Sequence, residues 1–260
     1  MKKIVTLVMG LMLLVFAAGL GSTAQHAEAA GKVLKVGTDA NFPPFDFYHG
    51  RLEVHTGFDI ELMDAMAPYM GYDKVEYINI PFENILDGLN AGLYDAAIAG
   101  ITVTSERQAK VDFSEGYIDS GLRVVINSNA VGQEGADILK GRRVAGEAGS
   151  YGLEVAEKVG ASQILPYRDL EDAIKMVANG MADCVVADGP VLAFFMANGY
   201  GDKVKFAGEH ELEESVMGIA VKKGNSELLA KINSALHEVR RSGKYKEIAV
   251  SYFGSTPHTH

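Results

Sequence analysis

The chain has 260 residues, of which 48% are hydrophobic and 22% charged, and its formal net charge at neutral pH is −10. This length allows one or two domains with substantial apolar cores. The acidic balance excludes a basic face for nucleic acid and a polybasic patch for a membrane surface. The single cysteine, Cys184, excludes an intrachain disulfide.

The first 29 residues have the pattern of a cleaved export signal. Lys2 and Lys3 precede an apolar run over residues 4–20, and a polar stretch then ends in the small-x-small triplet 27–29. A basic start, an apolar centre and such a triplet are typical of a secretory signal peptide. A transmembrane anchor is disfavoured because no basic stop-transfer cluster follows. We therefore expect cleavage after residue 29 and a soluble periplasmic protein that is stable without disulfides.

After the leader, segments of strand and helix length alternate. The expected strands cover residues 33–37, 74–80 and 96–99, and the expected helices cover residues 59–70 and 82–91. Strands that alternate with helices form parallel sheets covered on both faces, so the fold class is α/β. Ligands bind such sheets beyond the carboxyl ends of the strands.

The segment after the strand at 96–99 is the most informative in the chain. Gly100 ends the strand, Thr102 and Thr104 are favoured N-cap residues, and a short helix then carries Arg107. Backbone N–H groups, hydroxyls and a guanidinium therefore gather at the carboxyl end of a strand, where they can bind a small carboxylate. A capped helix with a solvated Arg107 is the alternative interpretation.

The second half of the chain repeats the alternation. A strand over residues 122–126 comes first, followed by expected strands at 143–145, 163–165 and 184–187, and by expected helices at 151–158, 170–179 and 191–198. A last amphipathic helix is expected over residues 227–240, where Leu228, Leu229, Ile232 and Leu236 form an apolar stripe. The second half therefore predicts another α/β unit.

An ordered set of short motifs carries a family resemblance that spans residues 32–254. The motifs are Val36-Gly37-Thr38-Asp39, Phe42-Pro43-Pro44-Phe45, Gly57-Phe58-Asp59, Leu89-Asn90-Ala91-Gly92, the run from Ala99 to Arg107, Val111-Asp112-Phe113-Ser114, Gly149-Ser150, Asp183 with Asp188, and Gly218-Ile219-Ala220-Val221. In this order and spacing they resemble the polar amino-acid family of periplasmic solute-binding proteins. Members of that family are soluble receptors of amino-acid importers.

The resemblance implies a clamshell of two α/β lobes joined by two crossing strands. Residues 30–117 would form the first part of lobe 1, residues 118–217 lobe 2 with the crossing strands at its ends, and residues 218–260 the return to lobe 1 with the C-terminal tail. The crossing strands are expected near residues 118–125 and 213–219. A free amino acid would bind between the lobes, which would close over it.

The resemblance also implies roles at the backbone end of that amino acid. Arg107 would hold the α-carboxylate, with Thr102 and Ser150 as further donors and Gly100 in the same loop. Asp188 would accept from the α-ammonium group. The alternative for Asp188 is an N-cap of the helix that starts near Pro190.

Aromatic and acidic residues are expected around the ligand side chain. Phe42 and Phe82 would flank its carbon stem, where aromatic faces also attract a cation; without the resemblance both are core residues. Asp39 would meet the distal end, although an Asx turn before Pro43 is an alternative. Glu147 stands where other members often have a basic or apolar residue. Two carboxylates facing one ligand end are costly without a cation, so the pair favours arginine or lysine over glutamine.

Two other functions remain open at this point. If Glu147 faces solvent, a glutamine-specific receptor becomes the alternative. Some proteins of this fold are cyclohexadienyl dehydratases, and Glu214 lies near the second crossing strand, where an acid could protonate a leaving hydroxyl. Because Arg107 and Asp188 follow the receptor pattern, we expect no catalysis. We expect no cofactor, metal or nucleic acid, a monomer, and the permease of an ABC importer as partner.

Overall fold

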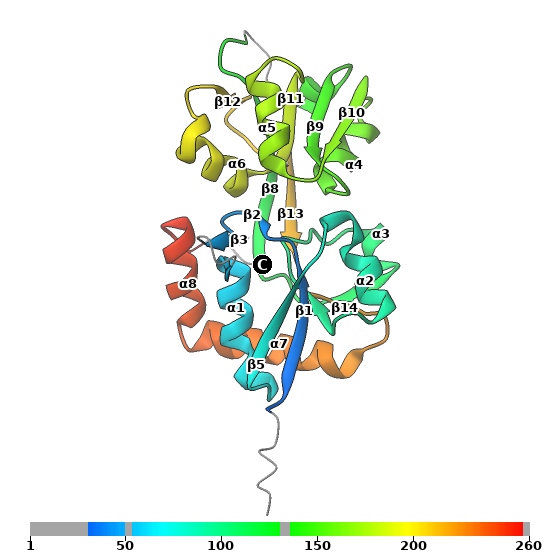
Figure 1. Ribbon diagram of the computed structural model, residues 1–260, viewed down its shortest axis with the longest axis vertical. Coiled ribbons are helices and arrows are strands. Elements are labelled where there is room, and N and C mark those ends of the chain that lie inside the picture. The colour runs from blue at the N-terminus through cyan, green and yellow to red at the C-terminus, as the bar shows by residue number, and fades with distance from the viewer. Residues whose placement is uncertain (1–30, 50–53, 131–135, 257–260) are drawn as a thin grey trace, which may run out of the picture. The chain divides into compact units, whose positions relative to one another are not determined.

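Alternating strands and helices build two open sheets in the computed structural model, and each sheet forms the centre of one lobe (Figure 1). The structure describes residues 31–49, 54–130 and 136–256. The expected leader at 1–29 lies outside the described residues.

The lobe 1 sheet has five strands in the order β5-β1-β6-β14-β7. Its strands are β1 (Val33–Thr38), β5 (Lys74–Asn79), β6 (Ala96–Ala97), β7 (Val111–Phe113) and β14 (Ala220–Lys222). β1 pairs in parallel with both β5 and β6, whereas β14 is antiparallel to β6 and β7. The chain therefore leaves β1 toward one edge of the sheet and then returns to its other side.

Helices cover both faces of this sheet. They are α1 (Phe58–Met66), α2 (Ile85–Ala91), α3 (Ser105–Gln108), α7 (Ser226–Arg241) and α8 (Lys244–Phe253). In α1, Leu62, Met63 and Met66 are fully buried, as expected for apolar residues at helical spacing. A small antiparallel sheet of β2 (Asn41–Phe42), β3 (Asp46–His49) and β4 (Val54–Thr56) lies beside them.

Lobe 2 repeats the winding of lobe 1. Its sheet has the order β10-β9-β11-β8-β12, with β9 (Arg143–Glu147), β10 (Gln163–Tyr167), β11 (Cys184–Asp188), β8 (Ile118–Asn127) and β12 (Val204–Phe206). Its helices are α4 (Tyr151–Lys158), α5 (Leu170–Ala178) and α6 (Gly189–Phe195). β9 pairs in parallel with β10 on one side and with β11 on the other. The order in which strands are added to the sheet therefore reverses at β9, as it does at β1 in lobe 1.

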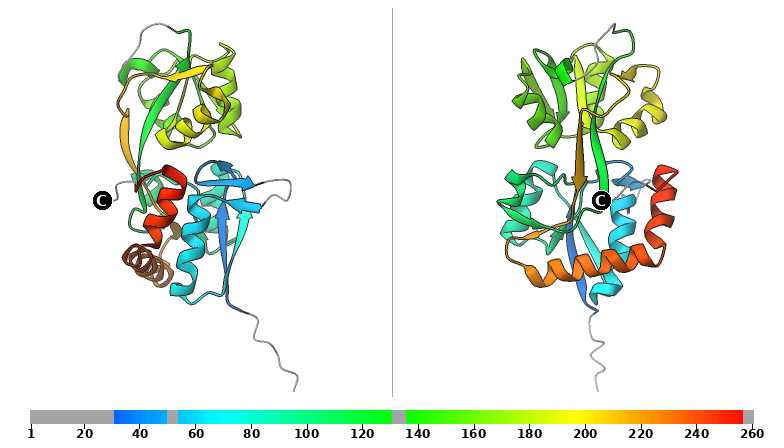
Figure 2. Two further views of the ribbon diagram at one scale, coloured as in Figure 1. Left: turned by 90° about the vertical axis from the view of Figure 1, so that its left-hand side faces the viewer. Right: turned by 180° about the vertical axis from the view of Figure 1, so that it is seen from behind.

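Two antiparallel strands connect the lobes. β8 runs out of lobe 1, and β13 (Glu213–Met217) returns beside it, with Glu213 opposite Leu122 and Met217 opposite Ile118. Figure 2 shows both strands between the lobes from two directions. These are the ranges in which the two crossing strands were expected.

The winding fixes where a ligand site can form. In an open α/β sheet, ligands bind at the carboxyl ends of the strands where the strand order reverses. In lobe 1 these ends are those of β1 and β6, which lead into Asp39 and Gly100. In lobe 2 they are the ends of β9 and β11, at Glu147 and Asp188. All four positions were singled out in the sequence.

The structure differs from the expected elements mainly at their ends. The helix expected over residues 59–70 becomes a 3-10 turn at Ala67–Met70, where Pro68 stands near the start of the new turn. The strand expected over 96–99 is paired only at Ala96–Ala97. The elements β2, β3, β4, β7, β12, β14 and α8 were not predicted.

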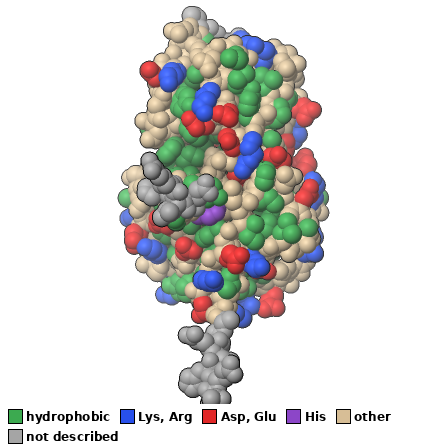
Figure 3. Space-filling view, viewed as in Figure 1, with side chains coloured by type: hydrophobic (Ala, Val, Ile, Leu, Met, Phe, Trp, Pro, Cys, Tyr) green, Lys and Arg blue, Asp and Glu red, His purple; other side chains and the backbone are tan. Residues whose placement is uncertain are grey.

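Neither the face shown in Figure 3 nor the helices indicate a strongly charged binding face or a membrane-spanning helix among the described residues. On the face shown in Figure 3, acidic and basic side chains are interspersed, so this face carries no patch of a single sign. None of the helices within the described ranges is long and apolar enough to cross a membrane.

Candidate ligand-binding site

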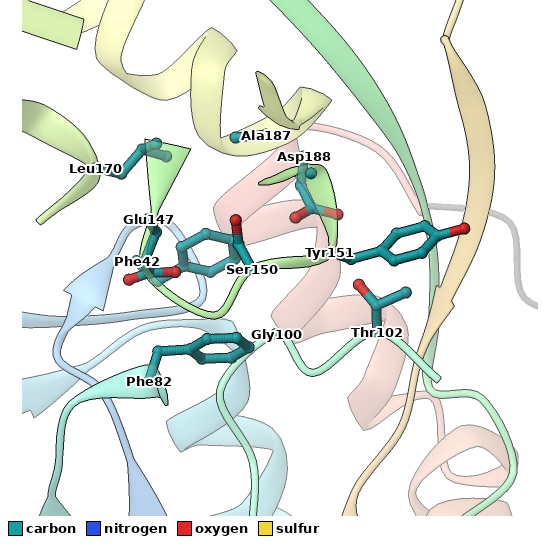
Figure 4. Close-up of a pocket in the computed structure, with 11 residues that line it drawn as sticks. Phe42, Phe82, Gly100, Thr102, Glu147, Ser150, Tyr151, Leu170, Ala187 and Asp188 are labelled. Atoms are coloured by element: carbon teal, nitrogen blue, oxygen red, sulfur yellow. The ribbon is translucent and has the colours of Figure 1, made fainter. Parts of the chain in front are cut away.

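A pocket with about 340 Å³ of empty space is lined by residues of both lobes (Figure 4). The lining residues are Phe42, Phe82, Gly100 and Thr102 from lobe 1, and Glu147, Ser150, Tyr151, Gly152, Leu170, Ala187 and Asp188 from lobe 2. This volume includes solvent at the open side of the pocket. Seven of the nine residues singled out in the sequence line it, and the other two, Asp39 and Arg107, lie beside it.

The carboxylates of Glu147 and Asp188 lie at opposite ends of the pocket, with the rings of Phe42 and Phe82 between them (Figure 4). Both rings are buried. Their π faces provide an apolar surface that also attracts positive charge. The pocket therefore combines an apolar middle with an acidic group at each end.

The lobe 1 wall depends on Gly100, whose φ of +57° is in the left-handed region. A Cβ atom there would lie 2.6 Å from Cε1 of Phe42, so glycine is required by both the backbone and the neighbouring ring. The Gly100 N–H donates to Oδ2 of Asp59 at 2.9 Å, and the Tyr117 hydroxyl donates to the same oxygen at 3.1 Å. Burial raises the pKa of Asp59 to about 7, although both hydrogen bonds oppose the shift.

Arg107 is buried behind this wall in the short helix α3. Thr104 is the N-cap, and its hydroxyl accepts the Arg107 N–H at 3.2 Å, as the sequence predicts. Nη1 of Arg107 donates to the Thr102 carbonyl at 2.8 Å, and Nη2 donates to the Gly149 carbonyl of lobe 2 at 3.0 Å. The solvated alternative is wrong, because Arg107 is only 7% exposed. A guanidinium has five N–H donors, so Arg107 retains donors for an anion.

Glu147 ends β9 and points into the pocket rather than to solvent. The residue is 3% exposed, and its Oε1 accepts no hydrogen bond from any described residue. Burial, with a further contribution from the nearby Asp39, raises the pKa of Glu147 well above its ordinary value; Arg168 opposes this shift. A buried carboxylate oxygen without a donor is costly, and a cationic group at this end of the pocket would remove that cost.

Asp188 ends β11 at the opposite end. It occupies the N-cap position of α6, as the alternative interpretation expects, but its side chain makes no capping hydrogen bond. Instead, its Oδ1 accepts from the Ser120 hydroxyl of β8 at 2.7 Å. Burial raises the pKa of Asp188 to about 6, against the effects of the Ser120 hydrogen bond and the Arg107 charge. Ser150, by contrast, caps α4, since its Oγ accepts from the Leu153 N–H at 3.5 Å.

Asp39 lies outside the pocket lining, in an ion pair that the sequence did not reveal. Nη1 of Arg168, from the turn between β10 and α5, lies 2.9 Å from Oδ1 of Asp39 and 2.7 Å from Oδ2. The Phe82 N–H also donates to Oδ2 at 2.8 Å. The alternative interpretation of Asp39 as the start of an Asx turn does not account for these side-chain hydrogen bonds.

Arg168 was missed although a usable signal exists. It lies between a strand predicted over residues 163–165 and a helix predicted over residues 170–179, and Glu147 and Asp188 likewise lie between a predicted strand and a predicted helix. The sequence also leaves the pairing of β10 with β9 undetermined, and this pairing is what brings Arg168 beside Glu147.

The geometry does not support the dehydratase alternative. Glu214, considered as an acid for a dehydratase, is exposed and is not among the residues lining the pocket. Among residues 31–49, 54–130 and 136–256, no group of three or more His, Cys, Asp and Glu side chains is arranged to hold a metal ion.

Comparisons with known proteins agree on one family. The model of the bacterial extracellular solute-binding proteins, family 3, matches residues 34–255. A probable histidine-binding protein of Neisseria gonorrhoeae is 31% identical over 233 residues, covering 88% of this chain and 86% of the relative. The L-arginine-binding protein of Pseudomonas aeruginosa is 29% identical over 239 residues, covering 86% of this chain and 89% of the relative.

Among solved structures, an ancestral arginine-binding protein has been determined with arginine and with glutamine. The arginine complex has a TM-score of 0.79 and 37% identity, covering 85% of this chain and 98% of the other. The glutamine complex has the same TM-score and identity, covering 86% and 98%.

Proposed function

Since the chain belongs to family 3 of the bacterial extracellular solute-binding proteins, we propose that it captures a free L-amino acid with a cationic side chain, such as arginine or lysine. The amino acid binds between the two lobes and is delivered to the membrane permease of an ABC importer. The protein is a binding protein and not an enzyme, as are the curated relatives that it resembles.

One observation carries the choice of a cationic ligand: Oε1 of Glu147 is buried at the end of the pocket opposite Asp188 and has no donor among the described residues. Arginine and lysine have one cation at the α-carbon and another at the end of the side chain. Each would therefore match one of the two carboxylates, while the carbon stem lies between the rings of Phe42 and Phe82.

The remaining roles follow from placing the α-ammonium group at Asp188. Thr102 and Ser150 line the same pocket from opposite lobes and can donate to the α-carboxylate. Arg107 lies directly behind them and supplies the positive charge, which makes such bonds stronger than neutral ones. In this arrangement Arg107 also closes the site, because it already contacts the Gly149 carbonyl in lobe 2.

Glutamine is a second candidate with its own support. The raised pKa of Glu147 favours its protonated form in the ligand-free pocket, and a protonated carboxyl can pair with an amide. The related ancestral arginine-binding protein was also solved with glutamine. The two candidates differ in charge, so a single substitution separates them.

The test is isothermal titration calorimetry of ligand-stripped protein with arginine, lysine and glutamine, on the parent and on Glu147→Gln. A cationic ligand predicts that the parent prefers arginine or lysine and that the variant loses this preference. A parent that prefers glutamine, or a preference that Glu147→Gln leaves unchanged, would show that Glu147 does not read the ligand charge. A thermal-shift screen of all amino acids would identify other ligands, because a ligand that binds only the folded protein raises its melting temperature.

We also propose the cellular setting. Members of the family are extracellular, and the basic and apolar start of the chain supports export with cleavage after residue 29 into the periplasm. The lobes extend over residues 30–117 with 218–260, and over 118–217. The protein acts as a monomer, because residues from both lobes of one chain together form the pocket lining.

A further inference from the structure

The ion pair between Asp39 and Arg168 changes the charge that a ligand meets at the Glu147 end of the pocket. Asp39 is 1% exposed, and each of its carboxylate oxygens accepts from two donors: Oδ1 from Asn41 and Arg168, and Oδ2 from Phe82 and Arg168. A carboxylate with this many donors has little remaining capacity to accept from a ligand. Asp39 is also absent from the residues lining the pocket.

The partner, Arg168, comes from the other lobe and stands beside Glu147. Tyr167 is paired with Glu147 in the sheet, and the Tyr167 carbonyl accepts the Ala148 N–H at 2.8 Å. Arg168 therefore follows directly after the position next to Glu147. Its charge acts on both carboxylates, but its hydrogen bonds are to Asp39, and Oε1 of Glu147 keeps no described donor.

Asp39, Arg168 and Glu147 thus form a group of two carboxylates and one guanidinium, with a formal charge of −1 when Glu147 is ionised; the carboxylate of Asp169, which is 45% exposed, lies 3.7 Å from Nη1 of Arg168 and is not counted in this group. We infer that Arg168 is a specificity-determining residue: by occupying Asp39 across the two lobes, it leaves one uncompensated negative charge, on Glu147, to be matched by a single positive charge of the ligand. This inference rests on the proposed function and assigns Asp39 to the closing contact between the lobes instead of to the ligand.

The charge count makes opposite predictions for the two partners. Arg168→Met makes the formal charge of the group −2. The ratio of arginine affinity to glutamine affinity should therefore increase about tenfold or more, as for removing a counter-charge within a few ångströms. Asp39→Asn makes the formal charge of the group 0, so the affinity ratio should fall by a similar factor. Both variants should bind every ligand more weakly, because each loses a contact between the lobes.

The double variant Asp39→Asn with Arg168→Met restores −1 and is the decisive case. If the charge count sets specificity, its affinity ratio returns to within about threefold of the parent. If Asp39 instead contacts the ligand directly, the double variant should have the low ratio of Asp39→Asn. A purely mechanical clasp would leave all four ratios equal. Either of the last two results overturns the inference.

A matched control pair lies in lobe 2. Arg143 and Asp183 form an ion pair at 2.8 Å, and neither lines the pocket. Arg143→Met and Asp183→Asn make the same changes in residue type and total charge, and they should leave the affinity ratio unchanged. Calorimetry with arginine and glutamine at low and high salt measures all variants, and the ratio differences should shrink at high salt because Arg168 is 40% exposed. A parent that binds none of arginine, lysine and glutamine would refute the proposed function, whereas a parent that binds them but whose variants show unchanged affinity ratios would refute only the role of Arg168.

Discussion

Asp188 should oppose the folding of the ligand-free protein while it favours binding, so Asp188→Asn should change stability and affinity in opposite directions. Burial raises the pKa of Asp188 from 3.8 to about 6, which corresponds to about 3 kcal/mol of unfavourable free energy for its ionisation in the folded state. Asparagine removes this cost and can still accept from the Ser120 hydroxyl. The variant should therefore be more stable at neutral pH, by at most roughly 6–12 °C in melting temperature for a chain of this size.

The pH dependence gives this prediction its sign. Below the unfolded pKa of 3.8, the Asp188 carboxyl is protonated in both states, so the parent and the variant should melt together. As the pH rises to about 6, the unfolded chain ionises first, and the parent loses stability relative to the variant. Above pH 6 the difference should be constant. Differential scanning calorimetry of ligand-stripped protein from pH 3 to 8 measures this curve.

Binding should show the opposite effect. Removing the negative charge that faces an α-ammonium group should weaken arginine binding by about 2–4 kcal/mol, as for other buried charge partners. Asp183→Asn is the matched control in the same lobe. The Asp183 carboxylate has a lowered pKa because Arg143 donates hydrogen bonds to it, so this variant should lose stability at neutral pH without a loss of ligand affinity. If Asp188→Asn is no more stable than the parent at pH 7, or if the difference does not change with pH, the argument from burial is wrong.

Three further substitutions test other parts of the site. Arg107→Ala should abolish amino-acid binding in calorimetry and leave the circular dichroism spectrum unchanged, because a lost charge-assisted pair costs several kcal/mol of affinity; retained affinity would remove Arg107 from the site. Glu147→Gln should weaken arginine or lysine by more than about 1 kcal/mol and spare glutamine, whereas an equal loss for all three would contradict a role in reading charge. Gly149→Ala should weaken all amino acids by the same factor, since its φ is +75° and a Cβ would lie 2.9 Å from Cα of Glu83 in lobe 1; a change in ligand preference would place Gly149 in the specificity pocket instead.

Much of the α/β alternation could be predicted because each segment carries its own periodic signal. The helix expected at residues 151–158 is α4 (Tyr151–Lys158) without change, and Ser150 caps it. Short elements escaped for a physical reason: β2, β4 and β7 have two or three residues each, too few for alternation to emerge. The missed helix α8 did carry a signal, because Tyr245, Ile248 and Ala249 are buried at helical spacing.

The residues of the site also differ in how far the sequence could predict them. Residues at strand ends, such as Gly100 and Asp188, could be found from the chain because the carboxyl end of a parallel strand is a local feature. The partner of Asp39 could not, because it depends on which strand lies next to β9 and on how the lobes meet. The distance along the chain between Asp39 and Arg168 is 129 residues. Long-range ion pairs of this kind leave no periodic pattern in the sequence. Here the ion pair that could not be predicted, between Asp39 and Arg168, affects the ligand charge that the site favours.

The two ends of the pocket together explain how a ligand can favour the contact between the lobes. Both Glu147 and Asp188 belong to lobe 2 and both have pKa values raised by burial, so contact with lobe 1 removes water from two carboxylates at once. A free amino acid with a neutral side chain supplies one cation, and one of the two carboxylates must then be protonated. Arginine or lysine supplies two cations, so both carboxylates can stay ionised while the lobes are in contact. Because only interactions that differ between two conformations can shift their equilibrium, the cationic side chain should contribute to closure as well as to affinity. The ligand preference and the closing motion would then depend on the same carboxylate, Glu147.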